Sequence, residues 1–139
     1  MAISGDSCWL ACGGPSENIF SMAGEFKPGV LLFDWKTGEL KKELKPDDES
    51  WQGNICGLAF HPGGFLVAVG GGKSGGRIWL WDIDTERVTP FSTVELPTAA
   101  RDFDLHAASS RMTVALYDGQ AVRNVTEDVG GVLQVYTVR

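Results

Sequence analysis

The clearest hydrophobic pattern of the chain lies in two runs, Phe65–Val69 and Arg77–Ile83, which a Gly-rich segment separates. The first run is apolar at every position, so an extended strand there presents apolar side chains on both faces. Strands of this kind are typical of a sheet that is covered on both sides. The second run ends near Trp81-Asp82, and a polar segment that favours a turn follows it. The pattern therefore predicts two adjacent, buried β-strands.

The pattern of the second run occurs three times along the chain. Gly29–Trp35 matches Gly76–Ile83, and Gly131–Thr137 matches both. The run that precedes each of them is also similar, at residues 9–14, 66–71 and 112–116. The chain is therefore built from a repeated unit of at least two strands.

A further strand-like segment ends at Phe60 and again at Leu105, and a histidine follows it each time. These equivalent positions are 45 residues apart, and the equivalent Ala68 and Ala115 are 47 residues apart. A repeat of this length that is made of short strands is typical of a propeller blade. The sequence therefore predicts three consecutive sheets.

The order of strand, short turn, strand ending in Trp-Asp, polar turn and fourth strand resembles the WD40 repeat family. Trp81-Asp82 is the one complete copy of the family's structural signature, and the resemblance covers nearly the whole chain. It implies an all-β fold of antiparallel four-stranded propeller blades, about three of them, with the first and last incomplete. It also implies that Trp81 is buried between neighbouring sheets. The blades would span residues 1–44, 54–94 and 99–139.

The chain departs from the family at several signature positions. Trp51–Asn54 replaces the Gly-His that is expected before a blade's first strand, and Ser74–Gly76 replaces the Asp that is expected before strand c. Phe33-Asp34 and Tyr136-Thr137 stand where the other two blades would carry Trp-Asp. The buried Asp–His–Ser/Thr–Trp network of the family is therefore not carried over to this chain.

The strands of each blade follow from the same pattern. Strand a of the first blade is expected to be mostly or wholly missing, and Gly14–Pro28 and Asp118–Gly130 are expected to be long connections between strands b and c. An alternative places strand c of the last blade at 120–126 and strand d at 132–138, but the match of Gly131–Thr137 with the other c strands favours the first assignment. The expected strands are 8–13, 30–35, 40–44, 55–60, 65–70, 77–83, 87–94, 100–105, 111–117 and 132–138.

The composition excludes several classes of partner. The 139 residues are 43% hydrophobic, include 18 glycines and five tryptophans, and carry a formal net charge of −6. This charge argues against nucleic acid and against an anionic membrane surface, because phosphate contacts need clustered Lys and Arg. No run of about 18 apolar residues could span a membrane. No signal peptide is visible, so the cytoplasm is the favoured location.

No set of residues suggests catalysis, a metal site or a cofactor, so we predict that the chain is not an enzyme. Cys8, Cys12 and Cys56 lack the paired spacing or added histidines of a zinc site and are predicted to be plain buried thiols. Gly70–Ser74 lacks the first glycine of a phosphate loop and the helix after it, so we interpret it as a hairpin turn. The two histidines are predicted to cap turns.

The predicted binding surface combines three connections. In a propeller the b–c and d–a connections emerge on one face, so Gly14–Pro28, Lys45–Asn54 and Asp118–Gly130 would lie together. A segment such as Asp47–Glu49 with Trp51 is most often a solvated loop; the alternative is a partner contact in which Trp51 serves as an aromatic anchor beside the acidic residues. The predicted partner-binding residues are Phe20, Phe26, Asp47, Asp48, Glu49 and Trp51.

These features predict a non-catalytic WD40-like propeller segment that serves as a protein–protein interaction scaffold. The alternative is a regulatory or ligand-binding propeller domain of a larger enzyme or sensor. Propellers have about four to eight blades, so the chain is expected to be the C-terminal, three-blade portion of a longer protein. By itself it would expose an apolar sheet face at each end, which predicts a homo-oligomer formed through the exposed sheet ends.

Overall fold

The computed structural model describes residues 1–20, 25–117 and 131–138. Within these residues the chain is all-β, with one short 3-10 turn at Ala107–Ser109. The strands are β1 (Ala2–Ile3), β2 (Trp9–Phe20), β3 (Glu25–Asp34), β4 (Leu40–Leu44), β5 (Asn54–His61), β6 (Phe65–Gly72), β7 (Gly75–Asp82), β8 (Ser92–Leu96), β9 (Ala100–His106), β10 (Arg111–Tyr117) and β11 (Gly131–Thr137).

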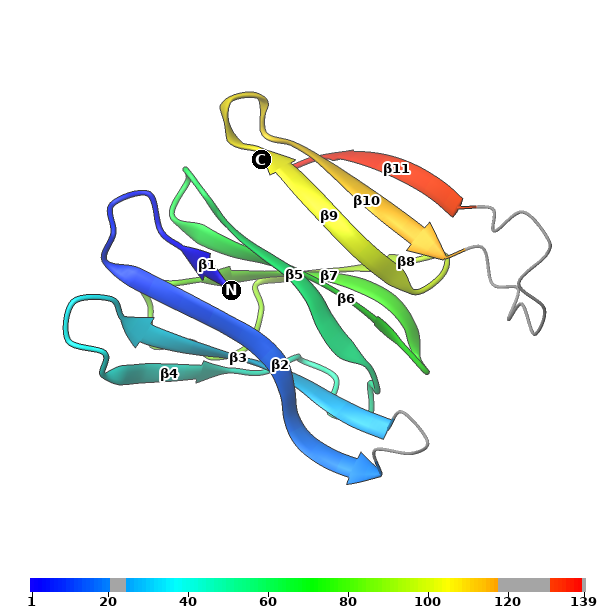
Figure 1. Cartoon of the computed structure of the whole chain (residues 1–139), viewed down its shortest axis with the longest axis horizontal. Coiled ribbons are helices and arrows are strands. Elements are labelled where there is room, and N and C mark those ends of the chain that lie inside the picture. Colours follow the sequence, from blue (N-terminus) through cyan, green and yellow to red (C-terminus); the bar gives the residue numbers. More distant parts are fainter. Residues whose placement is uncertain (21–24, 118–130, 139) are drawn as a thin grey trace.

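The strands form three antiparallel sheets, each made of strands that are consecutive along the chain. The first sheet has the order β1-β2-β3-β4, the second β5-β6-β7-β8 and the third β9-β10-β11. Figure 1 shows them as successive layers, with the second sheet (green) between the first (blue and cyan) and the third (yellow to red). The predicted all-β class and the three consecutive sheets are confirmed.

The second sheet is buried on both faces. Because successive side chains of a strand point to opposite faces, the run that is apolar at every position contributes to two separate cores. One core joins the second sheet to the first and contains Leu66, Ala68, Trp79, Trp81 and Ile83; the other joins it to the third and contains Val67, Val69, Ile78 and Leu96. Trp81 is 0% exposed, so the prediction that it is buried between neighbouring sheets is confirmed.

The prediction of a long loop at Gly14–Pro28 is wrong. β2 and β3 continue as a paired hairpin as far as Phe20 and Glu25, with two irregularities in register. Pro15 and Pro28 pair with each other beyond the last residues that pair with β1 and β4. A proline lacks the N–H of a ladder bond, but none of the described strands lies beside the hairpin at these positions to need it.

The outer strand of the second sheet lies later in the sequence than the predicted 87–94. β8 begins at Ser92, and the chain between β7 and β8 is bent rather than extended. The amide of Phe91 donates to the carbonyl of Leu80 (2.8 Å), and the carbonyl of Val88 accepts from the amide of Lys45 (3.0 Å). The segment 84–90 therefore reaches toward the first sheet before the chain returns along β7.

The last strand confirms the favoured assignment. β11 pairs directly with β10, in a register that joins Arg111 to Thr137 and Tyr117 to Gly131. Residues 131–137 therefore take the third position of this sheet, and the alternative that makes them a fourth strand is wrong. The predicted connection 118–130 lies outside the described residues. In the first sheet the first position is taken by β1, which has only two residues. The prediction that this strand is mostly missing is confirmed.

The prediction that the three cysteines are buried is wrong. Cys8 and Cys56 are exposed and Cys12 is half-buried. Cys12 lies opposite Leu31, on the face of the first sheet that points away from the second. Cys56 falls at a register irregularity of β5, where its Sγ donates to the carbonyl of Val69 (3.2 Å). Desolvation of the sulfur raises the pKa of the Cys56 thiol to about 11.

Candidate functional site

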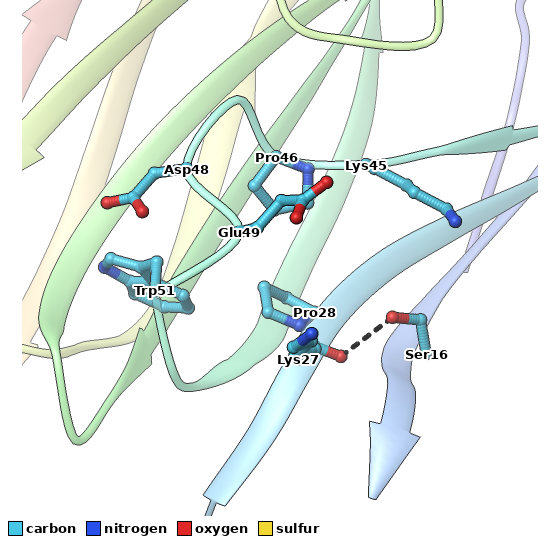
Figure 2. A pocket seen from close by; sticks show the side chains of 8 residues that line it. All are labelled: Ser16, Lys27, Pro28, Lys45, Pro46, Asp48, Glu49 and Trp51. Atoms are coloured by element: carbon cyan, nitrogen blue, oxygen red, sulfur yellow. Dashed lines mark hydrogen bonds between the residues drawn. The ribbon is translucent and has the colours of Figure 1, made fainter. Parts of the chain in front are cut away.

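A pocket of about 130 Å³ lies beside the segment that joins the first sheet to the second. Part of its wall comes from the β2–β3 hairpin and part from residues 45–51, which the sequence places in the predicted binding surface. Figure 2 shows Trp51 at one side and Ser16 at the other, with the rings of Pro28 and Pro46 between them. The lining residues are Ser16, Lys27, Pro28, Lys45, Pro46, Asp48, Glu49 and Trp51.

Asp48 gives the 45–51 segment its shape. Its Oδ1 accepts from the amide (2.9 Å) and hydroxyl (2.6 Å) of Ser50, and its carbonyl accepts from the amide of Trp51 (3.2 Å). These hydrogen bonds from Ser50, helped by the Arg77 guanidinium, hold the pKa of Asp48 below its usual value. Arg77 also binds Glu95 of β8 (3.0 Å), so the segment is fixed to the second sheet.

Trp51 belongs to the core, which corrects the prediction of an exposed anchor. Its side chain is 3% exposed and meets Trp79 edge to face, with ring centroids 4.9 Å apart. Gly53 leaves room for it, because a Cβ there would lie 2.5 Å from the Trp51 ring. An indole has a large apolar surface, and packing that surface against Trp79 is more favourable in free energy than exposing it to water. Trp51 therefore forms one wall of the pocket from inside the core.

The other predicted residues are only partly brought together. Asp48 and Glu49 line the pocket with Trp51, whereas exposed Asp47 accepts a hydrogen bond from Thr93 (3.1 Å). Phe26 is half-buried in β3, and its carbonyl accepts from the amide of Gly53 (2.9 Å). Phe20 ends β2, and its side chain lies outside the described part of the structure.

Five lining residues were missed by sequence reasoning. All five lie within the predicted connections Gly14–Pro28 and Lys45–Asn54, but no local pattern singled them out there. They meet because the hairpin extends past the end of β4 and reaches the 45–51 segment. The missed residues are Ser16, Lys27, Pro28, Lys45 and Pro46.

The pocket has an apolar floor and a charged rim. Pro28, Pro46 and the indole of Trp51 supply the apolar contacts. At the rim Lys45 lies 3.9 Å from Glu43, a weak exposed pair that leaves its ammonium open to other partners. Such a mixture suits the capture of one side chain of a partner. Among the described residues no cluster of three or more His, Cys, Asp or Glu could hold a metal ion.

Comparison with known protein families and with curated proteins finds no match to this chain. Within the described ranges no helix has the length and apolar character needed to cross a membrane. The candidate site therefore rests on its own geometry.

Truncation of Trp51 is expected to destabilise the fold. Trp51→Ala should lower the free energy of unfolding by about 3 kcal/mol, because it opens a cavity beside Trp79. Trp51→Phe should cost less than half as much, because it keeps an aromatic ring there and the indole Nε1 has no hydrogen-bond partner among the described residues. Urea unfolding followed by circular dichroism measures both values. Equal, near-zero costs for the two variants would mean that Trp51 does not pack as described.

Proposed function

We propose that the chain is a WD40-like β-propeller segment that acts as a non-catalytic protein-interaction scaffold. Its three sheets lie face to face in chain order, as consecutive blades do, and this arrangement supports the resemblance seen in the repeated strands. Short edges and stacked faces of this kind make a rigid support on which connections can carry binding residues.

The observation that carries the proposal is the preformed pocket at the 45–51 segment. Asp48 and Arg77 fix its backbone, and Trp51 anchors it in the core, so the pocket exists before any partner arrives. Preorganisation of this kind lowers the entropy cost of binding. Its charged rim and apolar floor match the composition of a protein interface better than that of a catalytic centre.

The test is capture of a protein partner from cell extract by the immobilised chain. Lys45→Glu and Glu49→Lys should each reduce capture about fivefold or more, because both side chains are exposed at the rim and change only its charge. Lys36→Glu is the matched control, because Lys36 lies in the turn between β3 and β4, at the other end of the strands. Unfolding curves should be alike for all three variants. If Lys36→Glu lowers capture as much as the rim variants do, the pocket is not the binding surface.

A further inference from the structure

A groove of about 520 Å³ opens at the opposite end of the strands from the pocket. The pocket lies where β4 ends and β5 begins, whereas the groove lies where β5 ends and β6 begins. Its walls include the turn between β1 and β2, the turn between β5 and β6, and the residues that follow β7; Figure 1 shows the first two turns close together. Its volume falls within the range of about 300–1,000 Å³ that is usual for ligand-binding sites.

The wall from the second sheet is rigid because His61 is fixed at both ring nitrogens. The amide of Gly63 donates to Nδ1 (2.9 Å), so Nε2 carries the proton and donates to the hydroxyl of Ser110 (3.1 Å). The ring also stacks on Phe65, with centroids 4.3 Å apart. These contacts tie the β5–β6 turn to the β9–β10 turn of the third sheet, and they confirm the predicted turn-capping role of this histidine.

The wall from the first sheet is fixed by Asp6. Its Oδ1 accepts from the hydroxyl of Ser4 and from the amide of Cys8 (3.0 Å), and the same Ser4 hydroxyl accepts from the amide of Trp9 (2.9 Å). The hydrogen bond from Ser4, followed by that from Cys8, holds the pKa of Asp6 below its usual value, so the carboxylate is charged at neutral pH. The turn therefore presents a fixed negative charge at the rim of the groove.

The groove combines aromatic and apolar walls with negative charge. Trp9 and Phe60 line it half-buried, and Ile3 lines it with 49% of its surface exposed. Asp6 and Asp84 are both exposed among the lining residues, which include no Lys or Arg. The nearby Lys42 ammonium is directed to the carbonyls of Ile83 and Thr85. A long cationic side chain fits this surface, because its stem can pack on apolar groups while its charged end meets carboxylates.

We propose that this groove binds an extended partner segment in which an arginine or lysine lies next to apolar residues. The cationic group pairs with Asp6 and Asp84 at the rim, and the apolar neighbours cover Ile3, Trp9 and Phe60. The charge excludes phosphate-bearing ligands, since two carboxylates repel them. The groove is a second site, separate from the pocket beside Trp51, so either site can be tested without the other.

The probe is an N-acetylated, fluorescently labelled peptide amide with the order glycine-leucine-arginine-leucine-glycine. Fluorescence polarisation at low salt should give saturable binding below about 1 mM, and a peptide with citrulline in place of arginine should bind at least about fivefold more weakly. Citrulline keeps the size and hydrogen-bonding shape of arginine but removes its charge. Binding should also weaken as salt is raised.

The protein variants localise the binding. Asp84→Asn should weaken the arginine peptide about fivefold, and the double change of Asp6 and Asp84 to Asn should weaken it further. Asp47→Asn is the matched control, because it removes the same charge from an exposed position near the other end of the strands. Weakening by Asp84→Asn together with an unchanged affinity for Asp47→Asn supports the proposal, and an unchanged affinity for Asp84→Asn contradicts it. Equal weakening by Asp47→Asn, equal binding of the citrulline peptide, or no binding up to about 1 mM overturns it.

Discussion

Replacing Trp81 with alanine is expected to lower the free energy of unfolding by about 3–5 kcal/mol. The side chain is 0% exposed in the core between the first and second sheets, where its ring stacks near Trp79 with centroids 6.0 Å apart. Its Nε1 donates to the carbonyl of Lys45 (3.3 Å), so the variant also loses a hydrogen bond that links the two sheets. Thermal and urea unfolding of the purified variant measure the loss.

Trp35→Ala is the control for Trp81→Ala, because it makes the same chemical change at a side chain that is 47% exposed. We expect it to cost less than about 1 kcal/mol. Trp81→Phe keeps most of the packing and can be measured if the alanine variant does not fold. Its loss of unfolding free energy should lie between those of Trp35→Ala and Trp81→Ala. If the Trp35→Ala and Trp81→Ala variants have the same melting temperature, Trp81 does not hold the two sheets together.

The 139-residue chain is expected to self-associate through the outer faces of its first and third sheets. Leu133 and Val135 of β11 are 67% and 62% exposed. Their counterparts on the other two sheets, Val30 and Ile78, are buried because another sheet covers them. The first sheet likewise presents a partly uncovered apolar face that includes Leu31, opposite Cys12. Exposed apolar sheet faces of this kind drive association.

The expected contact is head to tail. β5 of the second sheet packs on the first sheet, and β9 of the third sheet packs on the second. If this stacking of sheets continued, the first sheet of another copy would lie on the third sheet of this one. Asp102 and Asp104 lie at the β9 edge of that face and are exposed, which centres the contact on β10 and β11. A contact between two different faces of the same chain closes into a ring or continues as a filament.

Two blocking variants separate the possible contacts. Leu31→Glu blocks one face and Leu133→Glu the other, and light scattering after size exclusion should give about the 15.0 kDa monomer mass for each alone. Mixed in equal amounts, they should form a dimer through the one intact face of each copy. If only one variant prevents association, the contact is between two copies of the same face. A monomeric parent chain would contradict the expectation altogether.

The sequence alone predicted those features that depend on residues close together in the chain. The side chains of a strand alternate with a period of two, so the pattern of apolar and polar residues predicted β4 and β10 with their observed bounds and located β6 and β7 to within about two residues. The threefold repeat predicted three consecutive sheets. The resemblance to the WD40 repeat family implied that Trp81 is buried between neighbouring sheets, and its side chain is buried there.

The tertiary structure decided everything that depends on which sheets touch. The prolines of the β2–β3 hairpin indicated a loop, but they lie beyond the neighbouring strands, where a missing N–H removes no ladder bond. Trp51, which beside three acidic residues suggested an exposed anchor, is buried because Trp79 and the space at Gly53 receive it. The groove brings together turns of different sheets, so the packing of one sheet on the next creates it. The pocket joins the β2–β3 hairpin to the segment 45–51, so the length of that hairpin creates it. The residues of each site are far apart in sequence and no local period relates them.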